Sequence, residues 1–147
     1  MPIFLALIFC LVMAGCGESV KDSELDARSF TIKDLVMVQQ DTGITIPAGS
    51  RGLSMYYCRS QTDPSFIAKI EIPTASSASV ATAMEQIPVT DITSTNPLSK
   101  KVTWWNPSKA TTRIERKFKQ MSSVAFVDAL LCEEDGHWVL YVFWSAV

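Results

Sequence analysis

The stretch His-Trp-Val-Leu-Tyr-Val-Phe-Trp at residues 137–144 restricts the fold more than any other feature of this chain. It is rich in β-branched and aromatic residues, which favour strands, and apolar residues occupy both sets of alternating positions. Neighbouring side chains of a strand point to opposite faces of a sheet, so both faces here need cover. The stretch is therefore a central strand, or a strand whose second face is covered by an N-terminal helix or by a partner.

Four further segments have the pattern of strands with turn sequences between them. Asp63-Pro64 marks a loop after the first strand, and Glu134-Asp135-Gly136 turns the last hairpin. Strands joined by such short turns pair antiparallel, which predicts a sheet of about five antiparallel strands. The predicted strands are residues 53–58, 66–72, 111–118, 124–131 and 137–144.

Two segments are candidate helices. Residues 75–87 place apolar side chains on one helical face, and Pro88 follows as a stop. Residues 29–40 fit a short N-terminal helix ended by Gly43, although their apolar run 35–38 fits a strand almost as well. We therefore predict an α+β fold, in which one helix packs across a face of the sheet. A second, short helix at the N-terminal end of the domain is possible.

The N-terminal segment has the sequence of an export signal. An uncharged apolar run covers residues 3–14, and as a helix it would extend roughly 18 Å, short of the roughly 30 Å hydrocarbon core of a bilayer. That length is typical of the apolar region of a signal peptide. The run ends in Met13-Ala14-Gly15-Cys16, which resembles the lipobox of bacterial lipoproteins. An ordinary secretory signal that ends near a cysteine is the alternative.

The lipobox resemblance implies that the cysteine thiol is acylated and that the preceding peptide is removed. Residues 1–15 would be the signal peptide, residues 16–28 the lipidated Cys16 with a flexible polar tether, and residues 29–147 a single globular domain. Two or more acyl chains anchor a protein stably to a membrane. In enterobacterial lipoproteins an Asp after the cysteine favours the inner membrane, so Gly17 favours the outer membrane.

Several short segments are similar to those of a family of small bacterial envelope lipoproteins. They are Thr42-Gly43-Ile44 with Pro47, the strand 68–73, the Trp-Trp-x-Pro element and the closing Leu-Tyr-Val. The similarity spans most of the mature chain. It implies an exported domain and brings no particular activity with it.

Two cysteines, Cys58 and Cys132, remain once the signal is removed and Cys16 is lipidated. In an oxidising compartment we expect them to form a disulfide, which would close a loop of about 75 residues and add at most roughly 4 kcal/mol. Two separate buried thiols are the alternative, since a free cysteine behaves as a small hydrophobe.

No residue pattern in the sequence matches a catalytic or metal-binding motif. The single histidine, His137, follows a hairpin turn, where a solvated side chain is the ordinary outcome. Cys58, Cys132 and His137 lack the spacing of zinc ligands. Asp128 lies in the middle of an apolar strand, and we expect it to point to the solvent face. The chain is expected not to be an enzyme and to need no metal or cofactor.

A basic segment and a tryptophan pair are the best candidates for a partner-binding surface. The formal net charge is −2, which argues against nucleic-acid binding, yet residues 100–119 are locally basic and opposed only by Glu115. A solvated strand edge for the basic residues and a core-edge position for the tryptophans are the alternatives. The predicted contact residues are Lys100, Lys101, Trp104, Trp105, Arg113 and Arg116.

Three functions of different class remain. The first is a membrane-anchored, non-catalytic protein-binding module, for example of inhibitor or immunity type, which needs no reactive residues. The second is a carrier of a lipid or small hydrophobic molecule in the envelope, which needs an apolar cavity between sheet and helix. The third is an enzyme, and the missing base–nucleophile pair argues against it. We expect the first.

Overall fold

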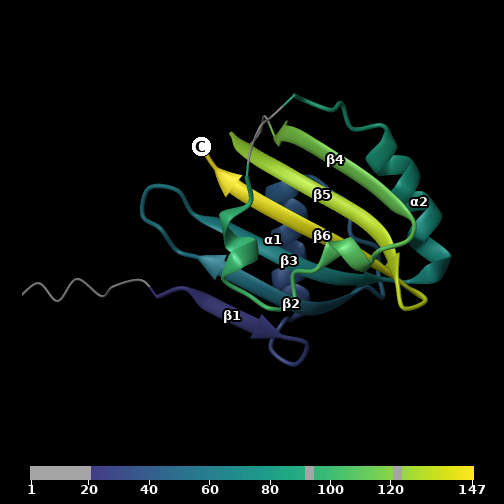
Figure 1. The fold of residues 1–147 in the computed structure, drawn as a ribbon, viewed down its shortest axis with the longest axis horizontal. Coiled ribbons are helices and arrows are strands. Elements are labelled where there is room, and N and C mark those ends of the chain that lie inside the picture. Colours follow the sequence, from purple (N-terminus) through teal and green to yellow (C-terminus); the bar gives the residue numbers. More distant parts are fainter. Residues whose placement is uncertain (1–20, 92–94, 121–123) are drawn as a thin grey trace, which may run out of the picture.

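A six-stranded antiparallel sheet forms the centre of the protein (Figure 1). The structure, a computed structural model, describes residues 21–91, 95–120 and 124–147, so the predicted signal peptide and Cys16 lie outside the described residues. The strand order is β1-β2-β3-β6-β5-β4. The strands are β1 (Ser23–Asp26), β2 (Arg51–Cys58), β3 (Ser65–Ile72), β4 (Arg113–Gln120), β5 (Ala125–Glu134) and β6 (His137–Ala146).

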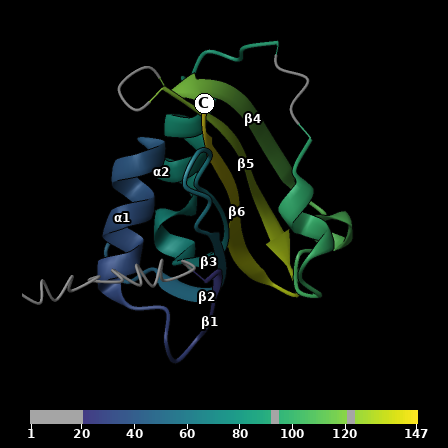
Figure 2. The same ribbon diagram turned by 90° about the vertical axis from the view of Figure 1, so that its left-hand side faces the viewer.

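Two α-helices, α1 (Ile32–Thr42) and α2 (Thr74–Glu85), cover one face of this sheet (Figure 2). The α+β fold expected from the sequence is confirmed. The sheet has six strands rather than about five, and two helices pack on it rather than one. The segment 29–40, whose pattern fits both a helix and a strand, contributes most of α1.

Strand β1 corrects the expected boundary between tether and domain. Residues 16–28 are predicted to be a flexible tether, yet Ser23–Asp26 pairs antiparallel with β2. Strand pairing uses backbone groups, so the polar side chains of this segment do not prevent it. Asp26 then fixes the following turn, because its carboxylate accepts hydrogen bonds of 3.0 Å from the backbone N–H groups of Arg28 and Ser29. Regular structure therefore begins before residue 29.

Strand β6 is central and covered on both faces, as its sequence predicts. Its residues Leu140, Val142 and Trp144 join the main core beneath the helices. Tyr141 and Phe143 belong to two smaller clusters on the opposite face. There the chain itself supplies the cover, because residues 97–110, with the 3-10 turns η1 (Pro97–Lys100) and η2 (Pro107–Lys109), lie across that face (Figure 2).

Local sequence sets both ends of α1. Asp34 Oδ2 accepts a hydrogen bond of 2.7 Å from the backbone N–H of Thr31, which is one half of a capping box. At the other end, Gly43 ends the helix in the left-handed conformation with φ of 73°. Phe30 precedes the N-cap and packs over Gly52 of β2, where a Cβ atom would overlap the Phe30 ring. These contacts fix the start of α1 against β2.

Candidate binding site

Both tryptophans of the predicted partner-binding set lie half-buried against the second face of the sheet. The Trp105 ring stands edge-on to Tyr141 with 5.1 Å between ring centres, and the two tryptophan rings are 6.0 Å apart. Trp104 Nε1 also donates a 3.0 Å hydrogen bond to Glu24 Oε1 on β1. The pair therefore fastens residues 97–110 to the sheet, which is the core-edge position given above as the alternative.

The two lysines of the set lie near the β1–β2 edge of the sheet. Lys100 is exposed in η1. Lys101 Nζ is 3.5 Å from Asp22 Oδ2 and 5.6 Å from the centre of the Tyr56 ring. Lys101 is thus engaged in contacts within the domain.

The two arginines of the set lie on β4, at the opposite edge of the sheet. Arg113 is exposed. Arg116 points to the helix-covered face, where its Nε donates a 3.0 Å hydrogen bond to the carbonyl oxygen of Met84. The six predicted contact residues therefore do not form one continuous surface.

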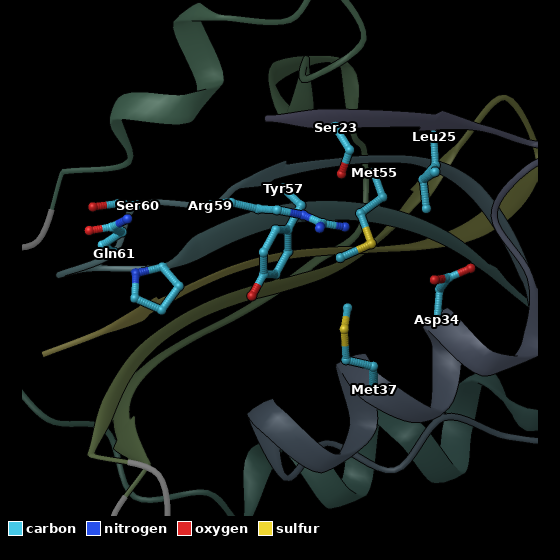
Figure 3. Close-up of a pocket in the computed structure, with 10 residues that line it drawn as sticks. Ser23, Leu25, Asp34, Met37, Met55, Tyr57, Arg59, Ser60 and Gln61 are labelled. Atoms are coloured by element: carbon cyan, nitrogen blue, oxygen red, sulfur yellow. The ribbon is translucent and has the colours of Figure 1, made fainter. Parts of the chain in front are cut away.

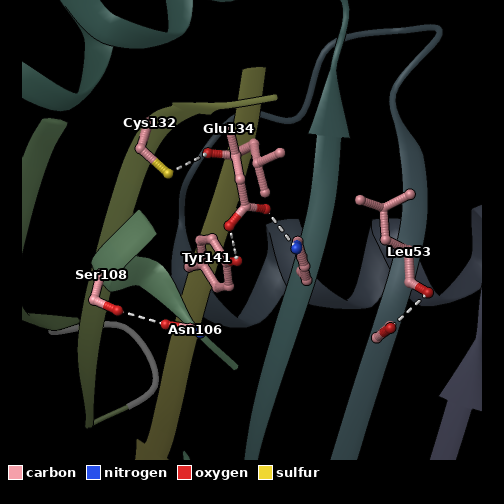
Figure 4. A network of polar contacts seen from close by, with 9 residues as sticks. Leu53, Asn106, Ser108, Cys132, Glu134 and Tyr141 are labelled. Carbon is pink, nitrogen blue, oxygen red and sulfur yellow. Dashed lines mark hydrogen bonds and ion pairs between the residues drawn. The ribbon is translucent and has the colours of Figure 1, made fainter. Parts of the chain in front are cut away.

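A polar network includes Glu134 and Tyr141 (Figure 4), and the Tyr141 ring is the one that Trp105 contacts. Glu134 Oε1 accepts a 2.8 Å hydrogen bond from the Tyr141 hydroxyl, and Glu134 Oε2 is 2.5 Å from Lys69 Nζ. The Lys69 and Glu134 side chains are only 18% and 11% exposed. Burial, followed by the hydrogen bond to Glu134, raises the pKa of Tyr141. The hydroxyl therefore stays protonated as a donor, and the network ties β3, β5 and β6 together rather than supplying a base.

His137 and Asp128, the other candidates for a catalytic or metal-binding role, have surroundings that are common for surface and half-buried side chains. His137 is exposed, and its Nδ1 is 3.5 Å from Glu71 Oε1. Asp128 is half-buried rather than fully in solvent, 3.7 Å from Lys117 Nζ, and burial raises its pKa. Across the described residues, no three His, Cys, Asp or Glu side chains are grouped to hold a metal ion.

The expected disulfide between Cys58 and Cys132 is not formed, and both are free thiols in the structure. The strand register explains this, because Cys58 pairs with Ser65, Ser65 with Ser145, and Ser145 with Phe126. Cys132 is thus three strands away and six residues further along β5. At about 3.3 Å per residue and 4.8 Å per strand, this is far beyond the roughly 7 Å that a disulfide spans. Burial also raises the pKa of the Cys132 thiol to about 11.

A groove of about 530 Å³ lies between α1 and the β1–β2 edge of the sheet (Figure 3). Its apolar walls are Leu25, Met37, Met55 and Tyr57, and we call it the α1–β2 groove. Met37 on α1 and Met55 on β2 point toward one another across it. The rim consists of Ser23, Asp34, Arg59, Ser60, Gln61 and Pro64.

Strand register brings the sheet side of this groove together. Leu25 pairs with Met55 and Ser23 pairs with Tyr57, so side chains of two adjacent strands project toward α1. Methionine is unbranched and polarisable, and it adapts its shape to different apolar surfaces. The volume lies within the range of roughly 300–1,000 Å³ that is usual for small-molecule sites. The groove is therefore large enough for a small ligand, and its methionine side chains suit an apolar one.

The two charged groups on the rim differ in how they are engaged. Asp34 is committed to the helix cap, since its carboxylate also accepts a 2.7 Å hydrogen bond from the Thr31 hydroxyl. Arg59 is exposed and its guanidinium carbon is 5.7 Å from the centre of the Tyr57 ring. In the described part of the chain, no carboxylate lies within ion-pair distance of Arg59. The groove thus offers one cation that is not neutralised by an ion pair there.

Asp22 holds the start of β1 beside the groove. Its carboxylate accepts a 2.7 Å hydrogen bond from the Tyr56 hydroxyl and a 3.2 Å hydrogen bond from the backbone N–H of Arg59. The Tyr56 hydrogen bond is the main cause that lowers the pKa of Asp22. The point at which the chain enters the domain is therefore fixed near the rim at Arg59.

This groove is not predictable from the sequence. Its walls come from three elements, and none of the residues forms a motif. The only available signal was Met37 in the predicted N-terminal helix, at a position that an alternating pattern assigns equally well to a strand.

Comparison with known proteins gives no relative: no family model, no curated protein and no solved structure matches this chain. Among the helices of the described residues, none has the length and apolar character needed to cross a membrane.

Proposed function

We propose that this chain is a lipid-anchored, non-catalytic binding protein of the cell envelope, and that the α1–β2 groove holds an apolar ligand. The observation that carries the proposal is the methionine-lined groove of about 530 Å³, with Met37 and Met55 facing one another across it. Binding in such a groove requires no nucleophile or base, in agreement with the ordinary surroundings of His137 and Asp128.

The anchor belongs to the same proposal. Cys16 would carry the lipid after removal of residues 1–15, with the outer membrane favoured over the inner by Gly17. Ser23 on the groove rim lies seven positions after Cys16, and a chain of that length spans at most about 25 Å. An anchored domain would therefore keep its groove close to the bilayer, where apolar ligands are concentrated.

Protein docking, the function expected first from the sequence, has weaker support. It relies on a joint surface of tryptophans and basic residues, but Trp104 and Trp105 pack on the domain's own sheet. Arg113 and Arg116 lie on β4, at the far edge from Lys101. The groove favours the carrier function instead, because it is the apolar cavity between sheet and helix that a carrier requires.

The anchor can be checked by the intact mass of the protein extracted from bacterial membranes. The expected mass is that of an acylated chain beginning at Cys16. A chain that retains Met1, or one without acyl groups, would contradict the anchor.

The state of the two remaining cysteines is a separate test. After unfolding without a reductant, Cys58 and Cys132 should each take up one maleimide. Failure of both thiols to react would contradict the strand register.

Groove binding can be tested with a hexadecanol that carries a photoreactive diazirine on its chain. The acylated protein in phosphatidylcholine vesicles should be labelled on peptides from α1 and β2. Met37→Trp should lower this labelling about tenfold, a change of about 1.4 kcal/mol, because the larger indole would occupy groove volume at the α1 wall.

Gln40→Trp is the matched control, since Gln40 is exposed on the same helix and does not line the groove. It should be labelled like the wild type, and thermal unfolding should show that both variants are folded. Leu25→Trp, which fills the groove from β1, should repeat the Met37→Trp result. Equal labelling of all four proteins would refute the groove as the binding site.

A further inference from the structure

We infer that the ligand of the α1–β2 groove is a single-chain amphiphile with an anionic head group, taken from the adjacent membrane. This inference rests on the proposed function and adds the chemical class of the ligand. It depends on the charge at the rim, the apolar walls, and the position of the groove relative to the anchor.

The charge comes from Arg59. Its guanidinium is exposed at the rim, and the described residues place no carboxylate within ion-pair distance of it. Figure 3 shows the side chain passing the Tyr57 ring in the direction of Met55. An arginine in this position presents several N–H donors that match a carboxylate or phosphate.

The second rim charge, the carboxylate of Asp34, lies on α1 and is held by the helix cap. Asp34 already accepts hydrogen bonds from the Thr31 backbone N–H and hydroxyl, both at 2.7 Å. The remaining polar rim residues, Ser23, Ser60 and Gln61, are uncharged. The preference for an anion is therefore local to Arg59, since Asp34, which keeps its negative charge, lies on α1 and makes no ion pair with it.

The walls favour an alkyl chain as the apolar part. The side chains of Leu25, Met37 and Met55 are not branched at Cβ, and those of the two methionines are flexible. All three lack charges and hydrogen-bond donors. Each methylene buried among them contributes through the hydrophobic effect without a fixed shape. A flexible wall of this kind accepts a chain better than it selects a rigid ring.

The source of such a ligand follows from the fold. Ser23 lines the groove at the start of β1, and the hydrogen bond between Asp22 and the backbone of Arg59 fixes this start beside the rim. If Cys16 is acylated, the cationic side of the groove lies within about 25 Å of the bilayer along the chain. Fatty acids and anionic lysophospholipids in that bilayer combine one chain with an anionic head group.

The test compares two photoreactive probes of equal chain length on the acylated protein in phosphatidylcholine vesicles. One is a diazirine-bearing palmitic acid and the other is the corresponding hexadecanol. For the wild type we expect stronger labelling of the groove by the acid. Arg59→Gln should reduce labelling by the acid roughly three- to fivefold and leave labelling by the alcohol unchanged, because an exposed ion pair contributes modestly.

Two matched variants control for charge and for position. Arg59→Lys keeps the cation and should retain most of the labelling by the acid. Arg28→Gln removes one positive charge from an exposed turn away from the groove and should behave like the wild type.

Each remaining outcome contradicts a different statement. Equal labelling by acid and alcohol that does not change in Arg59→Gln would overturn the anionic ligand and leave the groove as a binding site. Absence of labelling by both probes would overturn the proposed function itself. Labelling only after a lipase has removed the acyl chains on Cys16 would overturn the inference as well, because the groove would then hold the protein's own anchor.

Discussion

Replacement of Phe66 by alanine is expected to lower the free energy of unfolding by about 3–5 kcal/mol, the usual range for a buried phenylalanine. Phe66 on β3 is 0% exposed. It stacks between Tyr57 and Trp144, with ring centres 6.2 Å and 5.3 Å away and interplanar angles of 16°. Its removal would leave a cavity in a row of aromatic rings that joins three strands. Urea unfolding monitored by tryptophan fluorescence measures the effect.

Phe126→Ala is the matched control, because Phe126 is a half-buried phenylalanine on β5 in the same sheet. Its replacement should cost clearly less than that of Phe66. The row that includes Phe66 ends at Tyr57, which is a wall of the α1–β2 groove. A loss of under about 1 kcal/mol for Phe66→Ala would show that this row does not stabilise the core as described.

Gly52→Ala is expected to destabilise the protein by about 1–3 kcal/mol, although the change adds only one methyl group. The added Cβ would overlap the ring of Phe30, so the ring must move. Phe30 lies directly before the N-cap of α1, and its displacement would shift the helix that carries Met37. We therefore expect weaker groove labelling as well as a lower midpoint of thermal unfolding.

A double substitution separates this clash from a general effect on β2. Phe30→Leu leaves a smaller side chain over Gly52 and should recover part of the stability lost in Gly52→Ala. A coupling energy near zero in the double-mutant cycle would mean that the two residues do not interact in this way. Free rotation of the Phe30 ring away from β2 would be the physical reason for such a result.

The elements with a strong local pattern were predictable from the sequence. β3 alternates regularly, α2 ends before the stop at Pro88, and the β5–β6 hairpin turns at Asp135-Gly136, where both residues have positive φ. β1 was not predictable, because its four residues have one apolar side chain and pair through the backbone. The cover of the second face was not predictable either, since residues 97–110 acquire their place only by packing on the sheet.

The candidate site could not be predicted from the sequence either, because it depends on how distant segments pack in the fold. Residues that are near one another in the basic segment separate in the fold, because β4 places Arg113 at an exposed edge and Arg116 against α2. The groove, in contrast, combines Leu25, Met37 and Met55 from three elements. Only the strand order and the position of α1 bring these side chains together.

Binding of an apolar chain in the α1–β2 groove can be observed directly by NMR of ¹³C-methyl-labelled methionines during titration with palmitic acid. Met37 and Met55 line the groove, whereas Met84, a buried residue of α2, does not line it and serves as an internal reference. We expect saturable shifts of the Met37 and Met55 methyl signals while the Met84 signal stays in place. Methyl signals of Met37 and Met55 that do not move, or shifts confined to Met84, would contradict it.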